Sequence, residues 1–185
     1  MTQPIRPRGY REQNREVFYL NDPIVTAGPE DIAFLKCQAA ANPRKRSRLC
    51  AHPDIKAGVH EMLIVHHRDV FVRPHYHIGK SESFLVIEGA ATVLFFEESG
   101  SLLRAIRVGA AGSGLPFYYR IPERMIHALI IEAEWLVFQE VTQGPFDSVT
   151  NVTPPWSPDD QDPEQCRAFL AELGPLIEAQ RDSSR

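Results

Sequence analysis

Residues 73–89 read RPHYHIGKSESFLVIEG, and they place two histidines in front of an apolar run that a glycine closes. Residues two apart on a β-strand point to the same face, so His75 and His77 are expected to face one way and Tyr76 the other. The residues after His77 include a glycine and can turn the chain, so that Glu82 begins the next strand and returns over the imidazoles. Two neutral imidazoles and one carboxylate suit a divalent metal ion, because each supplies a lone pair and only one brings charge. The stretch therefore predicts a metal site beside a buried strand.

Short runs rich in β-branched and aromatic residues follow one another from about residue 58 to residue 146, with glycine, proline and acidic residues between them. The runs are MLIVHH, DVFVRPHYH, SFLVIEG, ATVLFFEE, LRAIRVG, FYYRIP, HALIIEA and WLVFQEV. Many short strands with no helix between them favour antiparallel pairing in a sandwich or barrel. We expect an all-β fold for this part of the chain.

The segments on either side carry other signals. Residues 29–42 begin with proline and two acids and stop before an Asn-Pro pair, which predicts a helix. Residues 160–181 carry apolar side chains at helical spacing and predict a second helix, which the Gly-Pro pair at 174–175 is expected to break or kink. Residues 1–25 are expected to form a polar arm and a short strand, EVFYL. With 185 residues, the chain 1–185 is expected to form one domain with a sizeable core.

Charge and cysteine usage narrow the possible partners and compartment. The net charge of −4 gives no reason to expect nucleic acid or an acidic membrane surface as partner, and the basic run PRKRSR at 43–48 is interpreted as a solvated surface. No apolar stretch is long enough to span a bilayer, and the first residues lack an apolar signal segment. Three scattered cysteines fit a reducing compartment, so a cytoplasmic protein is expected.

One further metal ligand has to come from a distant strand. Among the seven histidines, His127 is the natural choice, because it opens HALIIEA directly after the turn IPERMI. His66 and His67 are adjacent, so they point to opposite faces and cannot both be ligands. His52 and His60 lie before the main run of strands.

These spacings resemble the two motifs of the cupin superfamily. The first, HxH followed after four residues by glutamate and after six more by glycine, here reads His75, His77, Glu82 and Gly89. The second, PxGxxH, runs from Pro122 to His127, with Arg124 where the family usually has glycine. Asp69 stands in place of the leading glycine of the first motif, and Ile131 in place of the trailing asparagine of the second. The departures touch turns and packing and leave the four ligand positions intact.

A closer resemblance extends from about Pro43 to Trp156, where RSRLCAHPD, EMLIVHHRD, VRPHYHIGKSES, FYYRIP and GPFD are similar to WbuC-type cupin-fold metalloproteins. This resemblance implies an RmlC-like, double-stranded β-helix, that is, a cupin jelly-roll barrel. The N-terminal and C-terminal helices that complete the expected fold are predicted by the signals of their own segments. It also implies a bacterial protein linked to surface-polysaccharide metabolism, with an undefined reaction. The nitrogen and oxygen donors, with no thiolate among them, admit one divalent ion (Fe, Mn, Ni, Co, Cu or Zn). Cupins commonly pair, so a homodimer is expected, with EVFYL as a candidate exchanged strand.

Further side chains are candidates for binding a ligand beside the metal. By strand alternation Arg73 is expected on the same face as the two histidines, where it would clamp a carboxylate or phosphate, form an internal salt bridge to Glu140, or reach solvent from the end of the strand. Lys80 would either add positive charge over the cavity mouth or cap a solvated turn. One of Tyr118 and Tyr119 is expected to face the cavity, and the other to pack in the core. The tentative substrate-binding set is Arg73, Lys80, Tyr118, Tyr119, His67 and Glu140.

The sequence thus predicts a metal-binding protein with a small-molecule ligand, anionic or sugar-like, and no assigned catalytic residue. A metalloenzyme of the isomerase, epimerase or dioxygenase type is the first reading. A non-catalytic module that binds or senses a metal-chelated metabolite is the alternative. A purely structural metal is a third, disfavoured because structural sites usually close with no vacant position.

Overall fold

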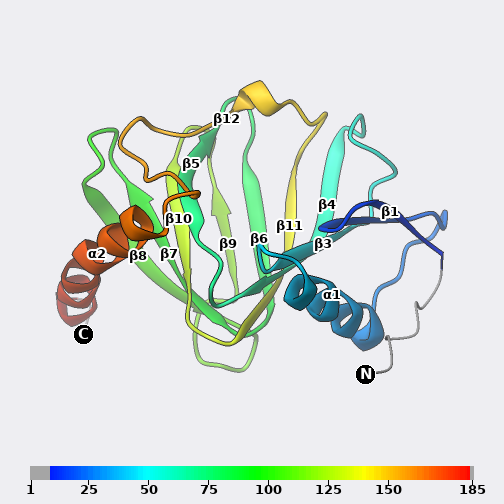
Figure 1. Ribbon diagram of the computed structural model, residues 1–185, viewed down its shortest axis with the longest axis horizontal. Coiled ribbons are helices and arrows are strands. Elements are labelled where there is room, and N and C mark those ends of the chain that lie inside the picture. Colours follow the sequence, from blue (N-terminus) through cyan, green and yellow to red (C-terminus); the bar gives the residue numbers. More distant parts are fainter. Residues whose placement is uncertain (1–8, 184–185) are drawn as a thin grey trace.

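A computed structural model of the chain describes residues 9–183, and its side chains as far as residue 180 (Figure 1). The molecule consists mostly of β-strands arranged in two sheets, with one helix near each end of the chain. The elements are β1 (Tyr10–Asn14), β2 (Val17–Leu20), α1 (Pro29–Ala41), β3 (Arg46–Cys50), β4 (Val59–His67), β5 (Val72–His77), β6 (Glu82–Glu88), β7 (Ala90–Phe96), β8 (Leu102–Gly109), β9 (Tyr118–Ile121), β10 (Ile126–Ile131), β11 (Trp135–Gln143), the short 3-10 helix η1 (Ser148–Thr150), β12 (Asn151–Val152) and α2 (Pro163–Ser183).

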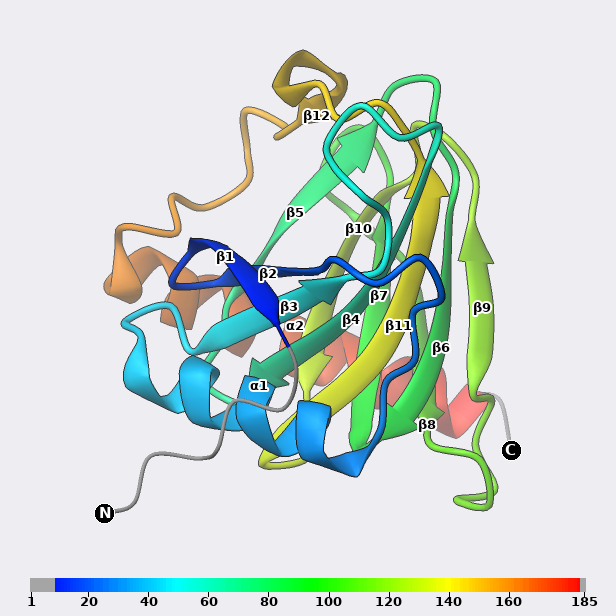
Figure 2. The same cartoon turned by 90° about the vertical axis from the view of Figure 1, so that its right-hand side faces the viewer.

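The strand order is that of a jelly roll. The seven-stranded sheet runs β1-β2-β3-β4-β11-β6-β9, and the five-stranded sheet runs β12-β5-β10-β7-β8 (Figure 2). The eight strands β4 to β11 therefore divide into two facing groups of four, β4-β11-β6-β9 and β5-β10-β7-β8, as in double-sheet jelly rolls. This confirms the expected mostly β, jelly-roll class. Within the described residues the two sheets face each other without a hydrogen-bonded ladder between them, so the expected closed barrel is an open, two-sheet structure.

The N-terminal strands extend the larger sheet. β2 pairs in parallel with β3 and antiparallel with β1, so both of its edges are hydrogen-bonded within its own chain. The segment EVFYL, expected as a candidate for exchange between copies, is used here inside one chain. Residues 1–8 of the expected arm lie outside the described residues.

α1 covers the outer face of the seven-stranded sheet. Its first turn begins with Pro29, and the carboxylate of Asp31 accepts a hydrogen bond of 2.7 Å from the Gly28 backbone N–H, which satisfies a group left free at the helix start. The apolar side of the helix and the sheet beneath it form one buried cluster: Phe34, Leu35 and Ala39 with Phe18, Leu20, Leu49, Val65 and Val137.

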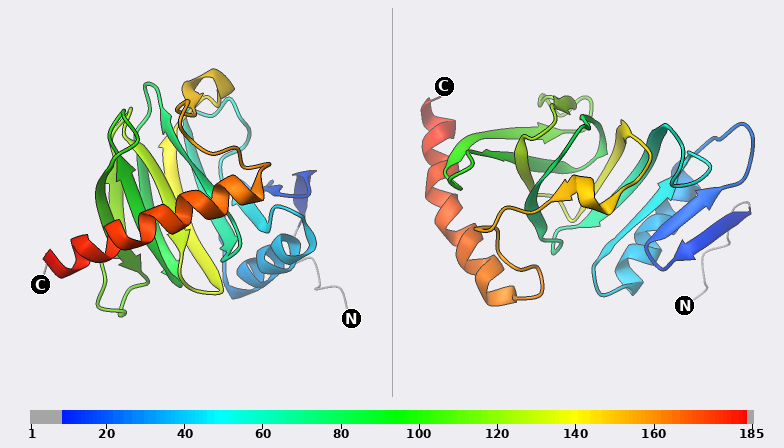
Figure 3. Two further views of the ribbon diagram at one scale, coloured as in Figure 1. Left: turned by 60° about the vertical axis from the view of Figure 1, so that its left-hand side comes forward. Right: turned by 90° about the horizontal axis from the view of Figure 1, so that it is seen from above.

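α2 lies across the outer face of the five-stranded sheet (Figure 3). Leu173 and Ile177 pack there against Leu94 and Phe96. The helix continues through Pro175, where the sequence predicted a break or kink. Proline removes one helical hydrogen bond, but burial of apolar residues on both sides of it favours the continuous helix. No helix in residues 9–183 combines the length and apolarity needed to cross a membrane.

Gly89 makes the tight connection between β6 and β7. Its φ of +84° is a left-handed conformation, and a Cβ atom at this position would lie 2.2 Å from the backbone oxygen of Trp135. Only glycine fits both demands. The turn sends β6 and β7 into different sheets, and the apolar side chains between the sheets then form the largest buried cluster, which includes Ile64, Phe84, Val93, Ile121, Leu136 and Phe138.

Candidate metal centre

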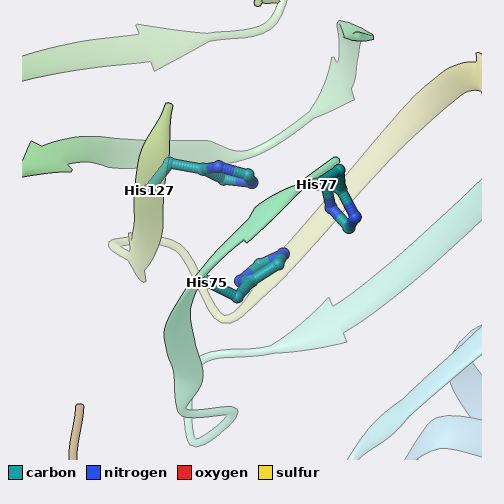
Figure 4. A group of neighbouring side chains, drawn as sticks. All are labelled: His75, His77 and His127. Atoms are coloured by element: carbon teal, nitrogen blue, oxygen red, sulfur yellow. The ribbon is translucent and has the colours of Figure 1, made fainter. Parts of the chain in front are cut away.

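Three histidines from two neighbouring strands converge between the sheets (Figure 4). His75 and His77 come from β5 and His127 from β10, and one ring nitrogen of each lies within 4.8 Å of the others. The ring centres of His75 and His127 are 4.4 Å apart, and those of His75 and His77 are 5.1 Å apart. This arrangement could hold a metal ion.

The backbone around these histidines fixes their positions. His127 stands directly opposite His75 in the register of β10 and β5, while β12 holds the other edge of β5 by pairing Asn151 with His77. The turn before β10 is also tied to β5, because the Arg124 N–H donates to the His77 carbonyl at 2.8 Å. Arg124 adopts a φ of +62°, the left-handed conformation that glycine would adopt more easily.

Backbone carbonyls select the ring nitrogen that His75 and His127 leave free. Nδ1 of His75 lies 2.7 Å from the Arg73 carbonyl, and Nδ1 of His127 lies 2.9 Å from the Met125 carbonyl. A carbonyl only accepts, so each Nδ1 carries the proton and donates it. Each Nε2 is then left with its lone pair, which is how metal-binding histidines are commonly oriented.

Glu82, the first residue of β6, brings a carboxylate to the same point from the opposite sheet. Its Oε1 lies 3.0 Å from His77 Nε2, and its Oε2 lies 3.3 Å from His127 Nε2. Glu82 is only 6% exposed, and His77 Nε2 and Glu82 Oε2 are buried with no hydrogen-bond partner in the described part of the chain. Close polar atoms without hydrogen-bonding geometry fit a site shaped around a cation.

The protonation states also suit a cation. Burial, with the charges of His127 and His77, lowers the pKa of His75 to about 3, although the Arg73 carbonyl opposes this effect. Burial by itself raises the pKa of Glu82, but in the metal-free protein the hydrogen bonds and positive charge that protonated His127 and His77 supply outweigh it and hold the pKa well below its usual value. At neutral pH, His75 is therefore neutral and Glu82 is ionised. Three imidazoles and one carboxylate make a donor set that fits a divalent first-row metal.

A cavity of about 550 Å³ opens beside the cluster, which is within the range of small-molecule sites. One part is lined by the three histidines and Glu82, another by β2, β3 and β4 of the larger sheet. Phe146, Asp147 and Asn151, which follow β11, also line it.

Two of the tentative ligand-binding residues line this cavity. Lys80 lines it with its ammonium group donating to the Pro145 carbonyl at 2.6 Å. Glu140 lies on the inner face of β11, between Met62 and Phe84 in the register of the neighbouring strands. Burial and the charge of Glu82 raise the pKa of Glu140 to about 8, and the charge of Arg48 only partly offsets them.

The structure does not bring Arg73 to the cavity. A bulge in β5 opposes Leu129 to Val72 and His127 to His75, so three residue steps on one strand match two on the other. The bulge breaks the alternation on which the sequence expectation depended. Val72 lines the cavity, and Arg73 donates from Nε to the Ser157 hydroxyl at 3.3 Å and from Nη2 to the Ser157 carbonyl at 3.2 Å.

The tyrosines and His67 are also placed away from the cavity lining. Tyr118 is 55% exposed on the outer side of β9, and Tyr119 stacks on Phe84 in the core with ring centres 4.7 Å apart. His67 packs against Trp135 and lies 3.2 Å from the Asp69 carboxylate. Its neighbour His66 lines the cavity instead, because adjacent strand residues face opposite sides.

The basic run at 43–48 is a feature of the cavity that sequence reasoning missed. β3 places Arg46 and Arg48 on its inner side, and these residues and Arg44 line the cavity. The period-two spacing of the three arginines was the signal, since it predicts one face of a strand.

The fold and this cluster together define a jelly-roll protein with a candidate metal centre. A family model described as a domain of unknown function, DUF6016, matches residues 29–108, which include His75, His77 and Glu82 but not His127. The search of curated proteins found no match.

Among solved structures, a Shewanella oneidensis protein, SO0799, is 10% identical with a TM-score of 0.47, over 70% of this chain and 77% of that one. Oxalate decarboxylase from Lactobacillus farciminis is 18% identical with a TM-score of 0.42, over 52% and 26% of the two chains. Procruciferin, the 11S globulin of Brassica napus, is 14% identical with a TM-score of 0.40, over 48% and 21%. This chain thus matches about a quarter of the length of the last two. At these scores the similarities carry no argument about function.

Proposed function

We propose that this protein is a metal-binding cupin that holds one divalent ion with His75, His77, Glu82 and His127 and uses it on a small, oxygen-bearing metabolite in the adjoining cavity. The convergence of three imidazoles within 4.8 Å, with the Glu82 carboxylate 3.0 and 3.3 Å from two of them, is the observation that carries this proposal. A bound ion would supply a Lewis acid that polarises a carbonyl or hydroxyl oxygen.

Glu140 is the residue of this chain best suited to move a proton near such a ligand. It lines the same cavity as the four ligands, and in the metal-free protein its pKa of about 8 leaves it able both to give and to take a proton near neutral pH. This property favours an isomerase or epimerase, in which a proton is removed and returned next to a polarised carbonyl. The sugar-like nature of the metabolite and the link to bacterial surface polysaccharide rest on the WbuC resemblance.

The test begins with elemental analysis of the purified protein and a spectrum of the bound ion, followed by titration with small oxygen ligands. A stoichiometric metal whose spectrum shifts on titration supports a centre with an open position. A metal-free protein that takes up no divalent ion would overturn the proposal. Turnover of keto and hydroxy sugars then separates an enzyme from a binding module, and loss of turnover in Glu140→Gln with metal content unchanged would support the proton-transfer role.

A further inference from the structure

Three arginines border the part of the cavity away from the metal centre. Arg46 and Arg48 lie two apart on β3, Arg44 precedes them by the same interval, and all three line the cavity. Strand alternation accounts for the shared side of Arg46 and Arg48, and Arg44 lies in the turn that precedes β3. β3 is an inner strand of the seven-stranded sheet, held by β2 on one edge and β4 on the other, so the row is anchored on rigid backbone.

The negative charge beside the three arginines does not balance their positive charge. Glu16 lies 3.6 Å from Arg44 Nε and 3.1 Å from Arg46 Nε, so two guanidinium groups share one carboxylate. Arg48 has no ion pair in the described part of the chain, and its Nε is buried without a hydrogen-bond partner. Three guanidinium groups less one carboxylate leave two positive charges.

The nearest titratable groups do not neutralise Arg48. Burial, with the charges of Arg44 and Arg48, lowers the pKa of His66 to about 4, and His66 Nδ1 is also buried without a partner. In the metal-free protein, burial and the charge of Glu82 raise the pKa of Glu140 to about 8, so at neutral pH this carboxyl is mostly protonated. A cation that is half-buried and unpaired costs free energy unless a ligand supplies the opposite charge.

The location of Arg48 relative to the metal centre sets the length of such a ligand. Across β4 and β11 the register places Arg48 in line with Val86 of β6, and Glu82 lies four residues from Val86, so the two backbones are offset by about 14 Å across the strands and about 13 Å along them. A single cavity connects the two regions. The ligand is therefore elongated, with different groups at its two ends.

We propose that Arg48 binds the phosphate group of a small phosphorylated metabolite whose opposite end reaches the His75, His77, Glu82 and His127 centre. The phosphate site is argued from Arg48 and the charged groups around it, and only the placement of the opposite end rests on the proposed function. A phosphate dianion matches the two uncompensated positive charges, whereas a carboxylate would leave one unmatched. A guanidinium group suits phosphate because it can donate two parallel hydrogen bonds.

The first test uses inorganic phosphate and metal-free protein, so that the metal centre plays no part. Calorimetry is expected to show binding to the wild type and a loss of roughly 10- to 100-fold in affinity in Arg48→Gln, the range for hydrogen bonds to charged groups. Arg73→Gln is the matched control, because it removes a guanidinium that bonds Ser157 outside the cavity, and it is expected to bind phosphate as the wild type does. Equal losses in both variants, no phosphate binding by the wild type, or equally tight binding of acetate would overturn the assignment.

The second test compares ribose 5-phosphate with ribose on metal-loaded protein, two probes that differ only in the phosphate. The wild type is expected to prefer the phosphorylated sugar by at least about tenfold, and Arg48→Gln to lose that preference. Arg48→Lys keeps the positive charge but loses the planar guanidinium group, so it is expected to retain part of the preference for the phosphorylated sugar. This variant provides the test if Arg48→Gln fails to fold. No preference in the wild type would overturn the proposal. The metal content is measured alongside, to separate the metal-centre hypothesis from the phosphate-site hypothesis. Failure to take up metal would contradict the metal centre, and the result with phosphate and metal-free protein would still stand.

Discussion

His127 lies directly opposite His75 in the register of β10 and β5, and the two ring centres are 4.4 Å apart. Both strands belong to the five-stranded sheet, whereas Glu82 begins β6 in the seven-stranded sheet. A metal bound by all of them would therefore join the two sheets. Because a one-residue slip turns every side chain of a strand to the other face, the pairing of β10 with both β5 and β7 also protects the site.

Removing single ligands is expected to abolish metal retention. His77→Ala and Glu82→Ala should each weaken binding by more than the roughly 10- to 100-fold that loss of a supporting hydrogen bond costs. Metal-to-protein ratios after dialysis measure the effect, and circular dichroism shows whether the sheets remain folded. His67→Ala is the matched control, since it removes an imidazole that packs on Trp135. Full metal occupancy in both ligand variants would contradict the ligand assignment.

Metal binding is expected to stabilise the fold as a whole, because the ligands come from both sheets. At a free metal concentration 100 times the dissociation constant, the free energy of unfolding should rise by about 2.7 kcal/mol. Urea unfolding with and without a chelator measures this difference. The Glu82→Ala variant should lose the gain, and an equal gain in that variant would show that the ion binds elsewhere.

Much of the fold follows from patterns that the sequence shows openly. Each of the eight apolar runs between residues 58 and 146 corresponds to one strand, from β4 to β11. The HxH spacing also placed two imidazoles on one face, because alternation holds locally from His75 to His77.

The arginines that do and do not line the cavity were harder to predict, for two physical reasons. Alternation failed at Arg73 because the bulge before His75 adds a residue, and a bulge leaves no clear trace in one sequence. The arginines at 44, 46 and 48 read as a solvated basic run, because only the pairing of β3 with β2 and β4 shows that their strand lies inside the sheet. Long-range strand pairing of this kind cannot be predicted from local composition.

Gly89→Ala is expected to be strongly destabilising. The costs of the left-handed φ and of the 2.2 Å approach to the Trp135 backbone oxygen add together, so the free energy of unfolding should fall by about 3 kcal/mol or more. Gly112→Ala is the matched control, because Gly112 has a φ of +89° but nothing within 4 Å of a built Cβ, and should lose only about 1 kcal/mol. Equal losses in urea unfolding would mean that the close approach to Trp135 does not matter.

Arg124→Gly should stabilise the protein slightly while keeping the metal centre. The φ of +62° costs an L-residue about 1–2 kcal/mol, and glycine removes this cost at an entropic penalty of about 0.5–1 kcal/mol. The free energy of unfolding, measured in urea, should therefore rise by up to about 1.5 kcal/mol. Metal content should be unchanged, because the backbone N–H that bonds the His77 carbonyl remains. A clear loss of stability would show that the arginine side chain contributes more than the strain it imposes.

Glu140 is expected to make the metal-free protein less stable as pH rises. Its pKa is about 8 in the folded state, raised by burial and by Glu82 and partly offset by Arg48, against an ordinary value of 4.5. The folded state thus holds a proton that the unfolded state has lost between pH 4.5 and 8, so stability falls across that window, by at most about 5 kcal/mol. Glu140→Gln keeps the neutral shape and should remove this slope, becoming the more stable protein above pH 8.

Urea unfolding between pH 6.5 and 8.5 isolates the effect, because the depressed pKa values of His66 and His75 act on stability below pH 6.5. Parallel slopes in the wild type and Glu140→Gln, with Glu134→Gln as the exposed-carboxylate control, would show that Glu140 is ionised in the fold across this range and would remove it as a proton-transfer residue.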